Sequence, residues 1–142
     1  MKIGKDYTGV GVCFFCHDGN GRYIFGHRSK NCKDEHDVWD IGGGGVSFGE
    51  TLEDAVRREI KEEYNAEAKQ LEYLGFREVH REHGGEKTHW VAFDFKVRVE
   101  PEQVRNNEPH KLDDVRWFRL DELPDRVHSQ FPTALRLYQH RL

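Results

Sequence analysis

With 142 residues, of which 36% are hydrophobic and 34% are charged, the chain suits one domain with one core over residues 1–142. No apolar run approaches the roughly 20 residues that span a bilayer and no signal peptide precedes the first expected strand, so we expect a cytoplasmic protein that enters no membrane. The formal net charge of −4 argues against a polynucleotide partner, because proteins that bind nucleic-acid backbones are normally basic.

The first part of the chain is predicted to form short strands. Residues 8–16 are rich in apolar side chains, and residues 22–28 alternate around two aromatic residues. The turn signal at residues 18–21, Asp-Gly-Asn-Gly, predicts that these strands form a hairpin. A polar loop over residues 29–37 then leads to a short strand over residues 38–41, and the four glycines at 42–45 are predicted to form a loop.

Cys13 and Cys16 form a C-x-x-C pair, but they lie within the first expected strand. An offset of three places two side chains on opposite faces of a strand. Redox and zinc pairs usually lie at turns, so neither function is favoured here. With an odd total of three cysteines, reduced thiols are expected.

Residues 51–64 are predicted to form a helix, with Thr51 as its cap and Asp54 in its first turn. The residues at helical spacing on one face begin apolar and then include two carboxylates: Leu52, Ala55, Val56, Glu59, Ile60 and Glu63. Glu62 lies one step round the helix from these carboxylates. Half-buried carboxylates need a partner, and a hard divalent cation such as Mg²⁺ or Mn²⁺ prefers oxygen ligands. On the helix alone, pairing with Lys or Arg elsewhere in the fold stays an open alternative.

The rest of the chain predicts more strands and a second helix. Strands are expected over residues 70–79, 87–99 and 114–120, with a polar connection over 80–86 and a loop over 100–112. Residues 131–142 are predicted as a terminal helix with Pro132 in its first turn. Several strands with two helices indicate an α/β fold whose mixed sheet is covered on both faces.

The segment from Gly44 to Ala66 resembles the Nudix box, G-x5-E-x7-R-E-U-x-E-E-x-G-U, where U is aliphatic. Seven positions match the pattern well: Gly44, Glu50, Arg58, Glu59, Ile60, Glu62 and Glu63. Asn65 stands where the family usually has Gly, and Ala66 stands where a larger apolar residue is common. Asn is the next best residue for the left-handed conformation that ends a helix, so the first departure is mild. The resemblance implies a Nudix-like α/β/α sandwich with a mixed β-sheet.

The resemblance also implies metal-dependent hydrolysis of a phosphoanhydride in a nucleoside diphosphate linked to another group. Glu59, Glu63 and Glu62 are the candidate ligands of Mg²⁺ or Mn²⁺, with the carbonyl group of Gly43 as a further candidate. Arg58 is expected to orient these glutamates. Glu50 is expected to bind the metal through water or to hold the glycine segment.

In a Nudix-like site the glycine segment approaches metal and phosphate, so Gly44 and Gly45 are candidate substrate-binding residues. Many members of the family have Pro-Gly-Gly here, whereas this chain has only glycines. We therefore expect the predicted loop to be less rigid before a ligand binds.

The general base is predicted to be either a glutamate of the box or Glu108, for which an ordinary exposed loop acid is the alternative. Arg28, at the end of the second strand, is a candidate phosphate ligand, and Trp39 is a candidate for stacking on a base. Most aromatic residues in strands belong to the core, which is the alternative for Trp39.

The substrate is less well defined by the sequence. Neither the Pro that often follows the box in ADP-ribose enzymes nor the Tyr of dinucleoside polyphosphate hydrolases is present. We expect a small nucleotide substrate, first a standard or modified nucleoside triphosphate that yields a nucleoside monophosphate and pyrophosphate. The alternatives are a nucleotide-sugar or ADP-ribose pyrophosphatase and a non-catalytic nucleotide-binding regulator, and a homodimer is left open.

Overall fold

The computed structural model describes all 142 residues, and its seven-stranded sheet is built around β1 (Gly9–His17). The other strands are β2 (Arg22–Arg28), β3 (Trp39–Asp40), β4 (Gly42–Gly45), β5 (Gln70–His83), β6 (Glu86–Arg98) and β7 (Leu112–Arg119). The main path of the sheet is β3-β2-β1-β6-β5, while β4 pairs with β1 and β7 pairs with β2. Only the β1–β6 ladder is parallel, so the sheet is mixed as predicted.

One edge of β1 is shared between two partners. Its first half pairs with β4, from Gly11 opposite Gly45 to Phe14 opposite Gly42. Its last residue, His17, lies opposite Tyr23 of β2. The predicted β1–β2 hairpin therefore forms only near its turn, and the strands separate where β4 takes the place of β2.

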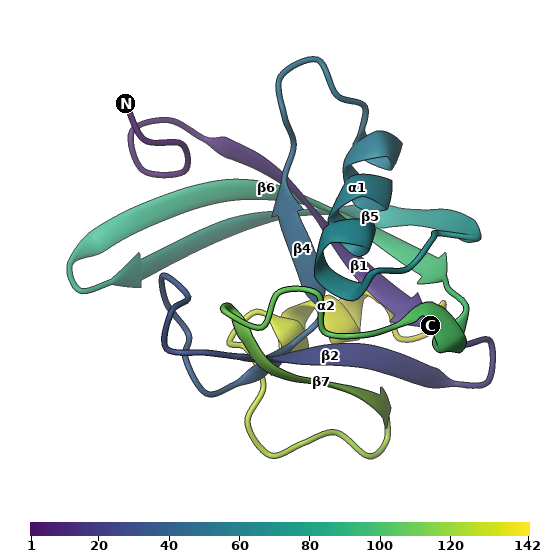
Figure 1. Ribbon diagram of the computed structural model, residues 1–142. Helices are drawn as coiled ribbons and strands as arrows, with labels where there is room; N and C mark the ends of the chain where they lie inside the picture. Colours follow the sequence, from purple (N-terminus) through teal and green to yellow (C-terminus); the bar gives the residue numbers. More distant parts are fainter.

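The two helices lie on opposite faces of the sheet (Figure 1), which confirms the predicted α/β/α sandwich. Val56 and Ile60 of α1 (Leu52–Tyr64) pack with Phe14 of β1 in one buried cluster. Phe131 of α2 (Phe131–Tyr138) packs with Phe15 of β1 in the other. Successive residues of β1 thus pack into two different cores. Each fully buried side chain contributes about 1.5–3 kcal/mol to the stability of the fold.

Residues 42–45 were predicted as a loop that is less rigid before ligand binding, and this prediction of a loop is wrong. They form β4, which is fixed by its ladder with β1. A run of glycines has low strand propensity, but β1 offers an unpaired edge there, and a Cβ at Gly42, Gly43 or Gly44 would lie less than 3 Å from neighbouring atoms. A Cβ on Gly42 would lie 2.2 Å from the ring of Phe14 on β1 and 2.5 Å from Oε2 of Glu63 on α1, so the close packing at Gly42 requires its absence.

The β5–β6 hairpin is longer than predicted. Residues 80–83 continue β5, and β6 begins at Glu86, so the expected polar connection shrinks to Gly84 and Gly85. Both glycines have positive φ, 58° and 81°, as a tight two-residue turn requires. The polar residues of this segment were interpreted as a loop, whereas they belong to a hairpin that extends beyond the helices (Figure 1).

Four smaller features concern the loop before β7, the end of α2, the cysteines and the length of the helices. The loop before β7 contains a short helical turn, η1 (Pro101–Gln103), and α2 ends at Tyr138 rather than at residue 142. Cys13 and Cys16 face different buried clusters, as expected for an offset of three in a strand. Both are free thiols, as also expected. Neither helix has the length and apolar character needed to cross a membrane.

Candidate active site

The helix α1 begins and ends as its sequence predicts. The side chain of Thr51 accepts a hydrogen bond of 3.1 Å from the backbone N–H of Asp54. Asn65 closes the helix with φ of 60°, and its N–H donates to the carbonyl of Lys61. These caps fix where the helix begins and ends. Because Val56 and Ile60 are buried against the sheet, the glutamates on the same stripe face β4.

Glu63 is a carboxylate without a full set of partners. Its Oε2 atom is buried and accepts no hydrogen bond. The backbone N–H of Gly43 lowers the pKa of this side chain, but its effect is smaller than those that raise it. Burial raises the pKa of Glu63 well above 4.5, and the charges of Glu59 and Glu108 raise it further. An orphaned oxygen among other carboxylates favours either a proton or a cation.

Glu59 lies one turn before Glu63 and is only 14% exposed. Burial raises its pKa, and the Nη1 atom of Arg58, 2.7 Å from its Oε1, counteracts this shift. Glu62 lies outside this buried pair, since its side chain is 50% exposed and lies 3.4 Å from Arg58. The box glutamates therefore occupy three environments, of which only that of Glu63 lacks a basic partner.

Arg58 connects the start of the helix to the glutamates. It donates to both oxygens of Glu50, at 2.7 and 2.9 Å, and to the carbonyl of Gly45 at 3.0 Å. These hydrogen bonds from Arg58 hold the pKa of Glu50 at about 2. Glu50 also accepts from the N–H of Ser47, so it ties the segment between β4 and α1 to the helix.

The absence of side chains on β4 creates the room that the glutamates occupy. A Cβ on Gly44 would lie 2.2 Å from Cδ of Glu59, and a Cβ on Gly42 would lie 2.5 Å from Oε2 of Glu63. By contrast, a Cβ on Gly45 would meet nothing within 4 Å. The glycines thus form a cradle against which two carboxylates rest.

Glu108 is brought to the same place by the loop between η1 and β7. Its charge raises the pKa of both Glu59 and Glu63, and its side chain is half-buried. A loop more than forty residues away in sequence thereby adds a third negative charge to the surroundings of Glu59 and Glu63. Sequence reasoning named Glu108 but did not supply the contacts that place it there.

The donor set fits a hard cation, although it is not preassembled. The side chains around the cradle supply carboxylate oxygens, the ligand type that Mg²⁺ and Mn²⁺ prefer. No three His, Cys, Asp or Glu side chains converge as a ready metal cluster, and Arg58 forms ion pairs with Glu50, Glu59 and Glu62. The unpartnered oxygen of Glu63 and the cradle beneath it are the features that accommodate an ion.

Arg28 and Trp39 lie apart from the glutamates. The guanidinium of Arg28 donates to the carbonyls of Asp34 and Glu35, so it braces the loop after β2. The half-buried ring of Trp39 is tilted by 32° against that of His27, with ring centroids 4.8 Å apart, and the guanidinium of Arg116 lies over it at 5.5 Å. Neither residue makes a hydrogen bond or ion pair with a glutamate of α1.

Asp40, which follows Trp39 on β3, was missed by the sequence reasoning. Burial raises its pKa, while the positive charges of His128 and Arg28 oppose the shift. Its own charge raises the pKa of Glu63, so Asp40 contributes to the electrostatics of the glutamate site. The signal available in the sequence was an acid within an otherwise apolar strand, Val38-Trp39-Asp40-Ile41.

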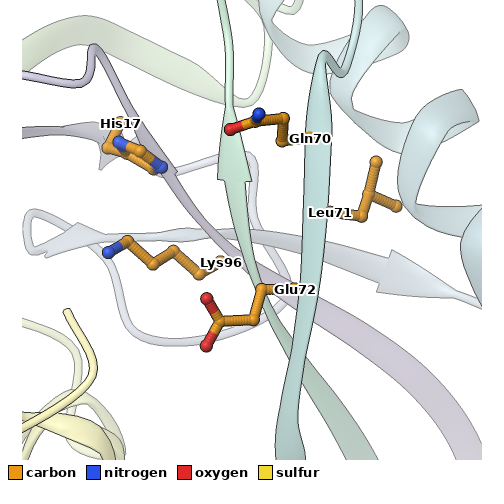
Figure 2. A pocket seen from close by; sticks show the side chains of 5 residues that line it. All are labelled: His17, Gln70, Leu71, Glu72 and Lys96. Carbon is orange, nitrogen blue, oxygen red and sulfur yellow. The ribbon is translucent and has the colours of Figure 1, made fainter.

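A hollow of about 500 Å³ lies elsewhere, lined by His17, Gln70, Leu71, Glu72 and Lys96. Figure 2 shows Leu71 directed toward α1, away from the other four side chains. Lys96 and Glu72 both bond to Arg141, beyond the end of α2. This hollow includes none of the predicted site residues, so it is distinct from the carboxylate cradle.

Comparisons with known proteins found a matching family model and similar proteins. The family model described as NUDIX domain matches residues 7–138. An RNA pyrophosphohydrolase of Caulobacter vibrioides is 31% identical over 134 residues, covering 83% of this chain and 74% of the relative. An NAD-capped RNA hydrolase NudC of Pectobacterium carotovorum is 30% identical over 118 residues and covers 83% of this chain, but only 42% of that relative is matched.

Solved structures show the same architecture. A MutT NUDIX hydrolase from Burkholderia pseudomallei is similar with a TM-score of 0.81 and 28% identity, covering 93% of this chain and 98% of the other. A MutT protein from Methanosarcina mazei Go1 has a TM-score of 0.77 at 20% identity, which shows a shared fold.

Proposed function

Since the chain belongs to the NUDIX domain family, we propose that it hydrolyses a phosphoanhydride bond in a nucleoside diphosphate linked to another group, with Mg²⁺ or Mn²⁺ as cofactor. It is a hydrolase of pyrophosphate bonds, the activity for which its relatives are named. The observation that carries the metal-dependent reaction is the orphaned Oε2 of Glu63, which lies beside Glu59 over the glycine cradle.

Each residue of the site has a part in this proposal. Glu59 and Glu63 would hold the ion, with Glu62 and the carbonyl of Gly43 as further donors. When bound, a divalent ion neutralises phosphate charge and lowers the pKa of its water. Arg58 keeps Glu59 in place and braces the backbone at Gly45. Glu108 would accept the proton of the attacking water. It is an acid on a separate loop near Glu59 and Glu63, and it is not one of the proposed metal ligands.

Within this class we propose a standard or modified nucleoside triphosphate as the substrate, giving a nucleoside monophosphate and pyrophosphate. The sequence lacks the markers of ADP-ribose and dinucleoside polyphosphate enzymes. Arg28 and Trp39 are the candidate contacts to phosphate and base. Because Arg28 already braces the loop after β2, it would have to exchange those bonds for a phosphate.

The end of an RNA chain is the second candidate substrate. This candidate conflicts with our expectation from the sequence that the protein has no polynucleotide partner. Relatives at 30% and 31% identity are named for the hydrolysis of RNA. The net charge of −4 provides little attraction for a phosphate backbone, so an RNA substrate would have to be bound mainly through its terminal nucleotide.

A substrate panel distinguishes these candidates. We expect kcat/KM for a nucleoside triphosphate to exceed that for ADP-ribose, nucleotide sugars and dinucleoside polyphosphates by at least about tenfold, or 1.4 kcal/mol of transition-state binding. An oligonucleotide with a 5′-triphosphate belongs in the same panel. Preference for ADP-ribose or a nucleotide sugar would contradict the triphosphate assignment, and preference for the oligonucleotide would establish the second candidate instead.

Gly44→Ala tests the cradle. The new Cβ would displace the flexible carboxylate of Glu59, and a misplacement of about 1 Å at a reacting centre can cost on the order of 100-fold in rate. We expect kcat to fall about 10- to 100-fold while the circular dichroism spectrum is unchanged. Gly45→Ala is the matched variant, because its Cβ meets nothing within 4 Å, and it should lose clearly less activity. Equal losses would contradict the role of the cradle.

We also propose a cytoplasmic location. All three cysteines are free thiols, and Cys16 is fully buried. Unpaired cysteines are the usual state in a reducing compartment.

A further inference from the structure

The segment from Gln103 to Glu108 runs along the last turn of α1. The N–H of Arg105 donates to the carbonyl of Tyr64, and the N–H of Asn107 donates to that of Glu63, both at 3.0 Å. The last carbonyls of a helix have no partner within the helix. This segment supplies those partners, so its backbone is held to the same turn that carries Glu63.

Two asparagine side chains strengthen this connection from opposite sides. Nδ2 of Asn65 donates to the carbonyl of Gln103, and Nδ2 of Asn107 donates to that of Lys61, both at 3.3 Å. The box pattern usually has Gly at the position of Asn65, and Gly has no side chain to make this bond. The departure from the pattern therefore adds a contact between α1 and the segment.

A third asparagine fixes the position of Glu108 within the segment. Oδ1 of Asn106 accepts from the N–H of Glu108 at 3.1 Å, and its Nδ2 donates to the carbonyl of Leu112 at 2.8 Å. The carbonyl of Glu108 accepts from the N–H groups of Lys111 and Leu112. The place of the Glu108 carboxylate thus follows that of residues 103–107, which bond to α1.

We propose that Asn65 is a positioning residue for Glu108: by joining the end of α1 to Gln103, it holds Glu108 beside Glu59 and Glu63. This inference rests on the proposed function only for the role of Glu108 in hydrolysis. The geometric part, that Asn65 restrains the segment, stands without it.

A cap role alone does not require the Asn65 side chain. Its φ of 60° suits Gly better than Asn, and the bond from its N–H to Lys61 is made by the backbone. Asn65→Gly therefore keeps the helix end and removes only the contact with Gln103. It separates the positioning of the segment from the termination of the helix.

The experiment compares four proteins: wild type, N65G, E108Q and the double variant. A single hydrogen bond corresponds to about a fivefold change in an equilibrium. We expect N65G to speed hydrogen exchange at the N–H groups of Arg105, Asn107 and Glu108 about three- to tenfold in the metal-free protein. Its Kd for Mn²⁺, measured from the electron paramagnetic resonance of free Mn²⁺, should rise about threefold or more.

The effect on Mn²⁺ should depend on Glu108. In the E108Q background, N65G should leave the Kd for Mn²⁺ unchanged, because the charge that Asn65 positions is gone. In nucleotide hydrolysis N65G should lower kcat with KM unchanged. Asn20→Gly, in the exposed turn after β1, is the control and should alter none of these quantities.

Unchanged exchange in N65G would overturn the inference, as would an equal loss of Mn²⁺ affinity with and without Glu108. Should N65G disturb the fold, Asn107→Ala repeats the comparison, since it keeps the backbone bond to Glu63 and loses only the side-chain bond to Lys61. Absence of Mn²⁺ binding in the wild type would overturn the proposed function instead, and hydrogen exchange would then decide alone whether Asn65 restrains the segment.

Discussion

Glu63→Gln is expected to lower kcat by at least three orders of magnitude and to leave the fold intact. The substitution keeps the size of the side chain while removing one negative charge. An ion bound at this cradle would lose its most buried ligand, the one whose Oε2 has no other partner. The measurement is kcat and KM with the preferred nucleotide at saturating Mg²⁺, together with the Tm of the metal-free protein.

The metal-free variant should be at least as stable as the wild type. Burial and neighbouring carboxylates raise the pKa of Glu63, so its ionised form is less favourable in the folded state than in the unfolded state. Removing that charge at neutral pH therefore does not lower Tm. Glu53→Gln is the matched control, since this exposed glutamate in the first turn should tolerate the change with full activity. Turnover like that of the wild type in the Glu63 variant would exclude Glu63 from the reaction.

The helix and its glutamates could be predicted because their signals are local. Thr51 caps the first turn, Asn65 closes the last in a left-handed conformation, and helical spacing places Glu59 and Glu63 on the buried stripe. None of these features depends on a distant segment. For the same reason the strands with clear alternation, such as β2, begin and end close to where the sequence predicts them.

The glycine strand could not be predicted because its cause is tertiary. Glycine has no side chain to favour a strand, and the ladder that fixes β4 comes from the free edge of β1. That edge exists because β2 leaves β1 after His17 and Tyr23. The sequence alone shows the four glycines. It does not show that β1 and β2 separate, nor that the glutamates of α1 pack against Gly42 and Gly44.

The surroundings of the glutamates were likewise set by contacts across the chain. Glu108 reaches them through the bonds of residues 103–107 to α1, and Asp40 reaches them through the pairing of β3 with β2. Under α2, Arg77 and Tyr138 both bond to the fully buried Asp94, at 2.6 to 2.8 Å. Such a network joins two strands and a helix, and no spacing in the sequence indicates it.

Removal of the divalent ion is expected to abolish hydrolysis and to leave the protein folded. The core beneath α1 consists of apolar side chains, including Phe14, Val56 and Ile60, which pack without any ion. Arg58 compensates part of the glutamate charge in the metal-free state through its contacts with Glu50 and Glu59. Treatment with EDTA should therefore reduce kcat below detection while the far-ultraviolet circular dichroism at 25 °C stays unchanged, and Mg²⁺ or Mn²⁺ should restore the activity.

The same ion should nevertheless raise the Tm, because a ligand that binds only the folded state stabilises it by about 2.7 kcal/mol at 100 times its Kd. Titrating Mn²⁺ into the metal-free protein should give this rise in the wild type and a much smaller one in the Glu63→Gln variant, which retains the same core but lacks the buried charge. Equal rises in both would place the ion away from the cradle. Unfolding by EDTA at ambient temperature would make the ion structural, and the apolar contacts of Val56 and Ile60 would then be insufficient to hold α1 on the sheet.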